Sequence, residues 1–171
     1  MRVFRGPDVA GTIEAIYVAA TSGAPMRGVA EAALVVGCGI SGDRNFRDDG
    51  AVHDQQITLI AAEAVARFNQ QTGLEIGPDE PRRNVVTRGI ELNELVGRQF
   101  RIGETTLTGL ELCEPCATLG QRLATPAVTA AQVVSAFAHR AGLRARIDIG
   151  GRIAAGDVVG PLTSPLNRVE L

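Results

Sequence analysis

The sequence of 171 residues contains no lysine, since all 17 basic residues are arginine. A chain without lysine cannot form a lysine Schiff base, so it cannot hold pyridoxal phosphate by the usual covalent link. The formal net charge is −2, so no general electrostatic attraction to nucleic acid is expected.

Long apolar runs and paired cysteines are also missing. No stretch approaches the length needed to span a bilayer, and the first eight residues lack the apolar core of a signal peptide. Three cysteines in a chain of this size do not suggest a secreted disulfide framework. We therefore predict a cytoplasmic protein with reduced thiols and without membrane or nucleic-acid partners. Its length fits a single domain, residues 1–171, with a core at about 11–160.

The pattern of apolar residues and turns predicts a mainly β protein. Gly and Pro punctuate short runs that alternate apolar and polar side chains, as strands do. Helical spacing is seen at 61–72, and again after a capping box formed by Thr129 and Gln132, with Gly142 as the stop. Strands and helices do not alternate regularly, so we expect a closed or nearly closed β-barrel with a few flanking helices. The predicted strands lie at 12–18, 29–36, 57–60, 84–87, 99–102, 105–112 and 143–149, with a last one from Val158.

The most informative motif is Cys113-Glu114-Pro115-Cys116, where a strand-like stretch gives way to a helix-compatible one. Pro favours the first helical position, which would put Cys116 in the first turn of a helix. Backbone N–H groups there lower the pKa of a thiol, making it a nucleophile or a soft-metal ligand. Cys113 is near enough in sequence to pair with Cys116 or to exchange with a persulfide on it.

Other interpretations of the cysteine pair remain open. Both residues can be small buried side chains at a strand–helix junction. A zinc site would need further ligands from Cys38, His53 and His139, and the spacing matches no standard zinc motif. A thioredoxin-like redox pair would need an earlier position, after the first strand of a βαβ unit. On their own, His53 fits a surface loop and His139 fits the exposed side of a helix.

Two arginine segments are candidates for anion binding. Arg82-Arg83-Asn84 comes directly before a predicted strand, and Arg44 ends a glycine-rich loop. Guanidinium forks and an amide suit a phosphate or the edge of a pterin. Because most arginines are solvated surface charges, this signal is weak for any single one of them.

Taken in order, these motifs resemble the MOSC family, the domain at the C-terminus of molybdenum-cofactor sulfurases that also occurs as stand-alone bacterial proteins. The resemblance runs from about Gly11 to Val159, and the family fold is a β-barrel with flanking helices. The matching segments are residues 42–45, 82–86, 92–97, 100–103, 113–119, 142–145 and 156–157.

The resemblance implies a function for several residues. Cys116 matches the family's characteristic cysteine, which is proposed to carry sulfur as a persulfide or to ligate the molybdenum of the molybdenum cofactor (molybdopterin). Arg82 matches a segment that contacts the pterin phosphate in cofactor-binding relatives, with Arg83 and Asn84 beside it. We expect the sulfur to come from an external donor of the cysteine desulfurase type, because the sulfurases' own pyridoxal-phosphate domain is missing from this sequence. Such transfer of function from family to chain is an analogy.

Three hypotheses follow. The first is a stand-alone MOSC protein in which Cys116 carries a persulfide or ligates molybdenum, with Cys113 as its helper. The second is a molybdenum-dependent reductase of N-hydroxylated compounds, supplied by an electron-donor protein. The third is a non-enzymatic module that holds a pterin or another anion through Arg82, Arg83 and Arg44, with Cys116 buried and inert.

Overall fold

The fold is a closed β-barrel, and the computed structural model describes residues 10–51 and 53–162 of the chain. The strand order β11-β7-β8-β9-β5-β6-β1 closes on itself through pairing of β1 with β11, which gives seven barrel strands in the described residues. Only β5 and β6 run parallel among the paired strands there. The prediction of a mainly β barrel is confirmed. The barrel strands are β1 (Gly11–Val18), β5 (Ile57–Ala61), β6 (Val85–Arg88), β7 (Gln99–Ile102), β8 (Thr105–Leu112), β9 (Leu143–Ile149) and β11 (Val158–Pro161).

Alternation along the strands fills the barrel. From Thr105 to Gly109 in β8 and from Leu143 to Ile147 in β9 every second residue is buried, as expected for strands with one face on a core. The interior is aliphatic apart from Phe100, and its central members are fully buried. The single domain expected for residues 1–171 stays a prediction. Residues 1–9, 52 and 163–171 lie outside the described part of the chain.

A second, smaller sheet lies at one end of the barrel and corrects one strand prediction. The apolar run 29–36 was expected to be one buried strand, but it is divided between β2 (Arg27–Val29) and β3 (Glu31–Val35). The physical reason is a change of partner at Ala30, since β2 pairs with β1 whereas β3 pairs with β10 (Gly151–Ala154). The glycine-rich loop that follows contains a further short strand, β4 (Gly39–Ile40).

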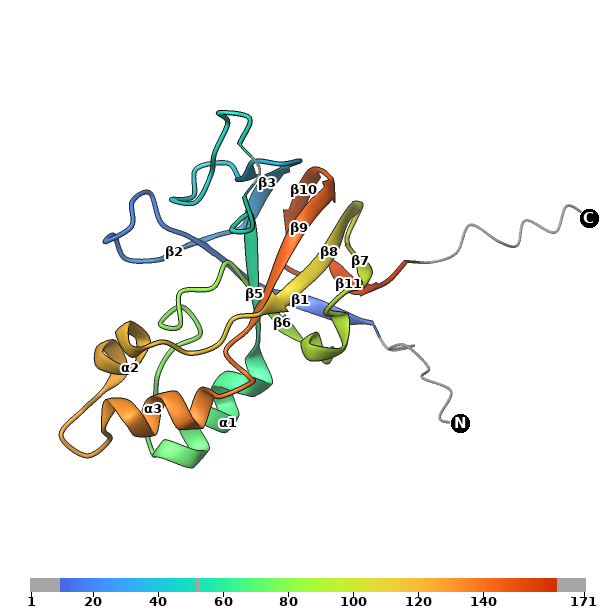
Figure 1. Ribbon diagram of the computed structural model, residues 1–171. Coiled ribbons are helices and arrows are strands. Elements are labelled where there is room, and N and C mark those ends of the chain that lie inside the picture. The colour runs from blue at the N-terminus through green and yellow to red at the C-terminus, as the bar shows by residue number, and fades with distance from the viewer. Residues whose placement is uncertain (1–9, 52, 163–171) are drawn as a thin grey trace, which may run out of the picture.

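Three α-helices gather at the opposite end of the barrel from β3 and β10 (Figure 1). They are α1 (Ala62–Thr72), α2 (Ala117–Leu123) and α3 (Ala130–Phe137), and a short 3₁₀ helix, η1 (Leu92–Leu95), precedes β7. No helix in the described residues is long and apolar enough to cross a membrane. A second apolar core joins the helices to the barrel, with Phe68 of α1 stacked on Phe137 of α3 at 4.1 Å between ring centres.

The helix ends confirm one sequence prediction and correct two. The capping box is present, because the Thr129 side chain accepts from the Gln132 N–H and the Gln132 side chain accepts from the Thr129 N–H. However, α3 ends at Phe137, so Gly142 does not close it. Helix α2 starts at Ala117 with Cys116 as its N-cap, so Pro115 lies outside the helix rather than at its first position.

Removal of the Phe137 ring is predicted to destabilise the protein strongly. Phe137 is fully buried in the core between the helices and the barrel, so Phe137→Ala leaves a cavity and should cost about 3–5 kcal/mol of unfolding free energy. Urea unfolding followed by circular dichroism measures this loss. Ser135→Ala, an exposed change in the same helix, is the matched control and should stay within about 0.5 kcal/mol. Equal effects of the two changes would contradict the assignment of this core.

Candidate functional site

Strand register brings distant parts of the sequence together at the helix end of the barrel. Leu112 of β8 pairs with Leu143 of β9, Leu143 pairs with Leu59 of β5, and Leu59 pairs with Val85 of β6. The cysteine segment follows Leu112, and the arginine segment directly precedes Val85. The pairing of these four neighbouring strands therefore places the cysteine segment and the arginine segment on the same side of the barrel.

Cys116 is the exposed thiol of this site. Of the three cysteines, all in the described part of the chain, Cys116 is exposed, Cys113 is buried and Cys38 is intermediate. Cys116 is the N-cap of α2, with extended backbone angles and no capping hydrogen bond of ordinary geometry. The N–H of Leu119, and then the N–H and hydroxyl of Thr118, nevertheless lie near the sulfur and lower the pKa of Cys116 against a smaller opposing effect of burial. Cys116 is thus the cysteine best suited to be a thiolate.

Cys113 lies only three residues earlier but in a different environment. Its side chain is 5% exposed, and its N–H donates to the carbonyl oxygen of Gly142 at 2.8 Å, which extends the β8–β9 pairing. Burial raises the pKa of Cys113, and the positive charges of Arg83 and Arg144 only partly oppose this effect. The two thiols are therefore unequal, since Cys113 favours the neutral form.

Arg83 is the cation that lies near both thiols. Its Nε donates to the carbonyl oxygen of Ala141 at 2.8 Å, which fixes the plane of the guanidinium. Burial, with some repulsion from Arg144 and Arg44, lowers the pKa of Arg83, while both thiol groups act in the opposite direction. Arginine still keeps its charge, because its usual pKa is so high. Within the described residues, the Arg83 Nη groups have no hydrogen-bond partner and no carboxylate forms an ion pair with them.

Gly142 leaves room for the Arg83 side chain because it has no Cβ atom. Its φ is +124°, and an added Cβ would collide with the carbonyl oxygen of Leu59 and lie 3.3 Å from the Nε of Arg83. A larger residue there would strain the backbone and push the guanidinium away. Gly142, which was expected to end a helix, therefore leaves the space that the Arg83 guanidinium needs.

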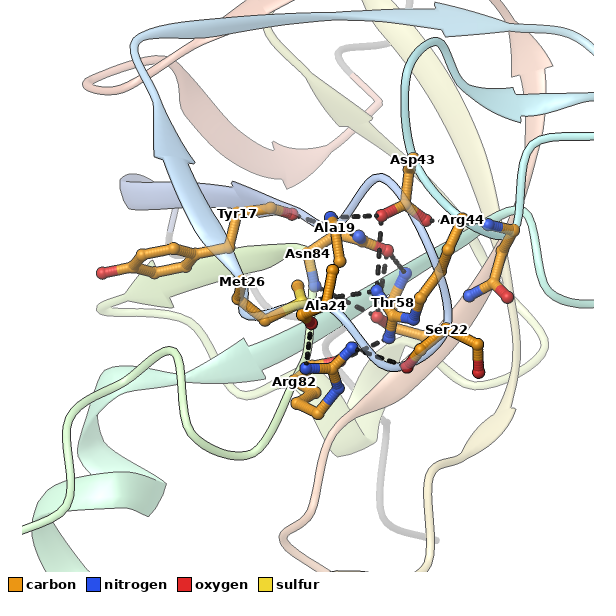
Figure 2. Close-up of polar contacts among 11 residues, drawn as sticks. Tyr17, Ala19, Ser22, Ala24, Met26, Asp43, Arg44, Thr58, Arg82 and Asn84 are labelled. Atoms are coloured by element: carbon orange, nitrogen blue, oxygen red, sulfur yellow. Dashed lines mark hydrogen bonds and ion pairs between the residues drawn. The ribbon is translucent and has the colours of Figure 1, made fainter.

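Arg82 points elsewhere, toward the loop between β1 and β2 (Figure 2). Its Nη1 donates to the carbonyl oxygen of Ala24 at 2.7 Å, and its Nη2 donates to that of Ser22 at 3.1 Å. Arg44 holds the other side, since its Nη2 donates to the Arg82 carbonyl oxygen at 3.2 Å and its Nη1 lies 3.3 Å from the carboxylate of Asp43. The structure thus brings Arg44 and Arg82 together, and the guanidinium groups of both donate to backbone carbonyl oxygens.

Asn84 is almost completely buried, with 2% of its surface exposed, and its amide is occupied by the barrel. Its Oδ1 accepts from the N–H and the hydroxyl of Thr58 on β5, and its Nδ2 donates to the carbonyl oxygen of Tyr17 on β1 (Figure 2). The sequence had suggested this amide as a pterin contact. In the structure its contacts join three barrel strands.

The histidines and Glu114 lie away from the sulfur atoms. Glu114 accepts from the N–H of His139 at 3.2 Å and lies 3.3 Å from its Nδ1, so this carboxylate is directed toward the corner after α3. His139 is beyond the helix with a φ of 63°, not on the helix surface as predicted. The Nε2 of His53 lies 2.9 Å from the carbonyl oxygen of Cys38.

Among the described residues no cluster of three or more His, Cys, Asp or Glu side chains could hold a metal ion, so the zinc alternative has no ligand set there.

Sequence reasoning missed two arginines of the site. Arg144 lies near Cys113, whose pKa its positive charge lowers, and it pairs with Glu111 at 2.9 Å. Arg122 of α2 is a charged neighbour of Arg82. Arg144 looked like one polar position in an alternating strand, and only its register with Thr58 and Glu111 reveals its place. Arg122 carries no sequence signal that separates it from a solvated surface charge.

Solved structures with the same fold are similar to this chain at low sequence identity. The YuaD protein from Bacillus subtilis aligns with a TM-score of 0.77 and 19% identity, over 88% of this chain and 94% of that one. YiiM from Geobacillus stearothermophilus aligns with a TM-score of 0.66 and 15% identity, over 90% of this chain and 75% of that one. YiiM from Escherichia coli gives 0.63 and 16%, over 92% and 72%. At this identity the likeness establishes the fold alone.

Sequence comparison supplies the family. No curated protein matches the chain. The model of the MOSC domain matches residues 40–160, which include the cysteine pair, the five arginines of the site, five of the seven barrel strands and all of β11 except its last residue. With this match over more than half of its length, and with the barrel and helices in place, the chain belongs to the MOSC domain family.

Proposed function

We propose that this protein is a stand-alone MOSC protein that acts through the Cys116 thiolate, as a carrier of persulfide sulfur or as the ligand of molybdenum in the molybdenum cofactor. One observation carries the proposal, namely an exposed cysteine whose pKa is lowered by neighbouring N–H groups, close to the unpaired guanidinium of Arg83. A soft, anionic sulfur beside a fixed positive charge suits both roles.

Sulfur transfer to Cys116 needs no cofactor in this chain. The thiolate attacks the outer sulfur of a persulfide on an external donor of the cysteine desulfurase type. The bond between the two donor sulfurs breaks, and the inner sulfur leaves with the electron pair as the donor's thiolate. The new persulfide on Cys116 is itself an anion, so the N–H groups of Leu119 and Thr118 and the charge of Arg83 stabilise it as they stabilise the thiolate.

The same residues fit the molybdenum cofactor that the resemblance implies. Cys116 would ligate the metal through sulfur, and Arg83, free of any carboxylate partner in the described residues, would meet an anionic group of the cofactor. The cofactor would supply a redox-active metal, which the proposed reduction of N-hydroxylated compounds requires. Cys113 is held neutral below the surface, which favours Cys116 over Cys113 in either role.

The exposure of Cys116 argues against a purely non-enzymatic anion-binding module. That hypothesis expects a buried, unreactive Cys116, with only the arginines in use. In the structure Cys116 is exposed and Cys113 is the buried member of the pair. A thiol with lowered pKa at the surface is reactive unless a ligand covers it.

The pH dependence of alkylation should show the lowered pKa of Cys116. Only the thiolate reacts, so the rate rises with pH through the pKa and the midpoint should fall below that of the same residue in the urea-unfolded protein. Thr118→Val removes a hydroxyl that favours the anion, so it should move the midpoint upward. Iodoacetamide labelling followed by mass spectrometry of the peptide measures both. A native midpoint at or above the unfolded value would refute the thiolate assignment.

Persulfide formation should depend on Cys116. After incubation with a cysteine desulfurase and cysteine, the intact protein should gain one sulfur atom, and Cys116→Ser should reduce this gain to background. Cys38→Ser is the matched control and should behave like the wild type, because Cys38 lies in a separate loop. Mass spectrometry and cyanolysis of sulfane sulfur measure the result. Retention of the sulfur in Cys116→Ser would rule out the carrier role.

A further inference from the structure

Arg82 and Arg83 are adjacent in sequence but serve different parts of the molecule. The guanidinium of Arg82 lies against the backbone of the β1–β2 loop, where it bridges the carbonyl oxygens of Ser22 and Ala24 (Figure 2). The guanidinium of Arg83 lies instead beside Gly142, whose carbonyl oxygen accepts from the Cys113 N–H, and its charge acts on both Cys113 and Cys116. One arginine therefore faces the loop, and the next one faces the thiols.

Arg44 completes the hold on this loop, which we define as Ala19–Met26. The Arg44 N–H donates to the carbonyl oxygen of Ala19 at 2.7 Å, and its Nη1 donates to the sulfur of Met26 at 3.3 Å. Its Nη2 donates to the carbonyl oxygen of Arg82, so the two arginines are also joined to each other. The buried carboxylate of Asp43 accepts from the Ala19 N–H at 3.1 Å. The loop is thus tied at its start, its middle and its end.

The backbone of Arg82 supports this reading. Its φ of 62° is the left-handed conformation, which costs a non-glycine residue roughly 1 kcal/mol and persists only where the surroundings enforce it. Its N–H closes a turn onto the Asp79 carbonyl oxygen at 3.0 Å. Glycine would make this turn without strain but has no side chain, whereas the planar guanidinium fork of Arg82 bridges two carbonyl groups of the loop.

Arg83 is the better prepared of the pair for an anion. Its Nε bond to Ala141 fixes the guanidinium plane while both Nη groups lack a partner in the described residues. Arg82, by contrast, would have to release two loop carbonyl groups before turning to a ligand. Pre-organised donors bind an anion more tightly than donors that must first break other bonds.

From this geometry we propose that Arg82, with Arg44, is a positioning residue that locks loop Ala19–Met26, and that Arg83 is the member of the pair that recognises anions at Cys116. The proposal rests on the proposed function in taking Cys116 as the reactive thiol. It differs from the family resemblance, which would give the anion contact to Arg82.

Two alkylating reagents of different charge test the anion-recognition part. Iodoacetate is an anion and iodoacetamide is neutral, so the ratio of their rates at Cys116 reports the positive field near the sulfur. Arg83→Gln should lower this ratio severalfold, and Arg83→Lys, which keeps the charge, should largely restore it. Arg82→Gln should leave the ratio at the wild-type value. An equal or larger drop in Arg82→Gln would overturn the proposal, and this arm decides alone if Arg83→Gln does not fold.

Hydrogen–deuterium exchange tests the lock. Amides of Ala19–Met26 should exchange faster in Arg82→Gln and in Arg82→Gly, although the glycine variant relieves the backbone strain. Arg82→Lys should not restore protection, because one ammonium group cannot hold both carbonyl oxygens in the same geometry. Arg83→Gln should leave exchange in this loop unchanged. Unchanged loop protection in both Arg82→Gln and Arg82→Gly would overturn the positioning role.

These outcomes separate the inference from the proposed function. If Cys116 accepts no persulfide while the rate ratio and the loop exchange respond as described, the sulfur-carrier role fails and the division between Arg82 and Arg83 stands. If Cys116 accepts a persulfide but Arg82→Gln lowers the rate ratio, the function stands and the division fails.

Discussion

The site depends first on the buried amide of Asn84. It bonds to Thr58 on β5 and to Tyr17 on β1 immediately before β6 begins, and it does so beside the parallel strand pair of the barrel. A buried amide without partners would cost about 1–3 kcal/mol, so these bonds specify where the chain joins the sheet. Arg82 and Arg83 precede Asn84 by two residues and by one residue, respectively, and their guanidinium groups contact different segments of the chain.

A second constraint separates the two thiols. The Cys113 N–H continues the β8–β9 ladder through Gly142, which draws this side chain inward and raises its pKa. The chain then leaves the sheet through Glu114 and Pro115, and the next thiol emerges at the N-cap of α2. Because Glu114 is directed to His139, its negative charge is drawn toward the corner after α3 rather than toward the sulfur. A motif that looks symmetric in sequence therefore gives one buried thiol and one exposed thiol.

The parts of this arrangement that follow from local rules could be predicted from sequence. The capping box at Thr129 and the alternation of β9 from Leu143 to Ile147 depend on neighbouring residues, and both were predicted correctly. Gly142 and Pro115 were misassigned because each residue type suits two structures. Glycine ends helices and also permits close backbone approach, and proline fits the first helical turn or the segment before it. Arg144 could not be identified, because its neighbours come from strand register between segments far apart in sequence.

Several arginines gather around the site, although the net charge of the whole protein is negative. Burial, and then the charges of Arg44 and Arg122, lower the pKa of Arg82, whereas burial with the charges of Arg144 and Arg44 lowers the pKa of Arg83. The carboxylate of Asp43 contacts Arg44. Planar guanidinium groups tolerate such crowding, because backbone carbonyl oxygens satisfy their donors without neutralising their charge. A protein with a net charge of −2 thus gathers positive charge near the exposed thiol of Cys116. Under the proposed function, positive charge there favours anionic partners over neutral ones, and a persulfide anion on Cys116 would be stabilised by the same charges that would attract its donor.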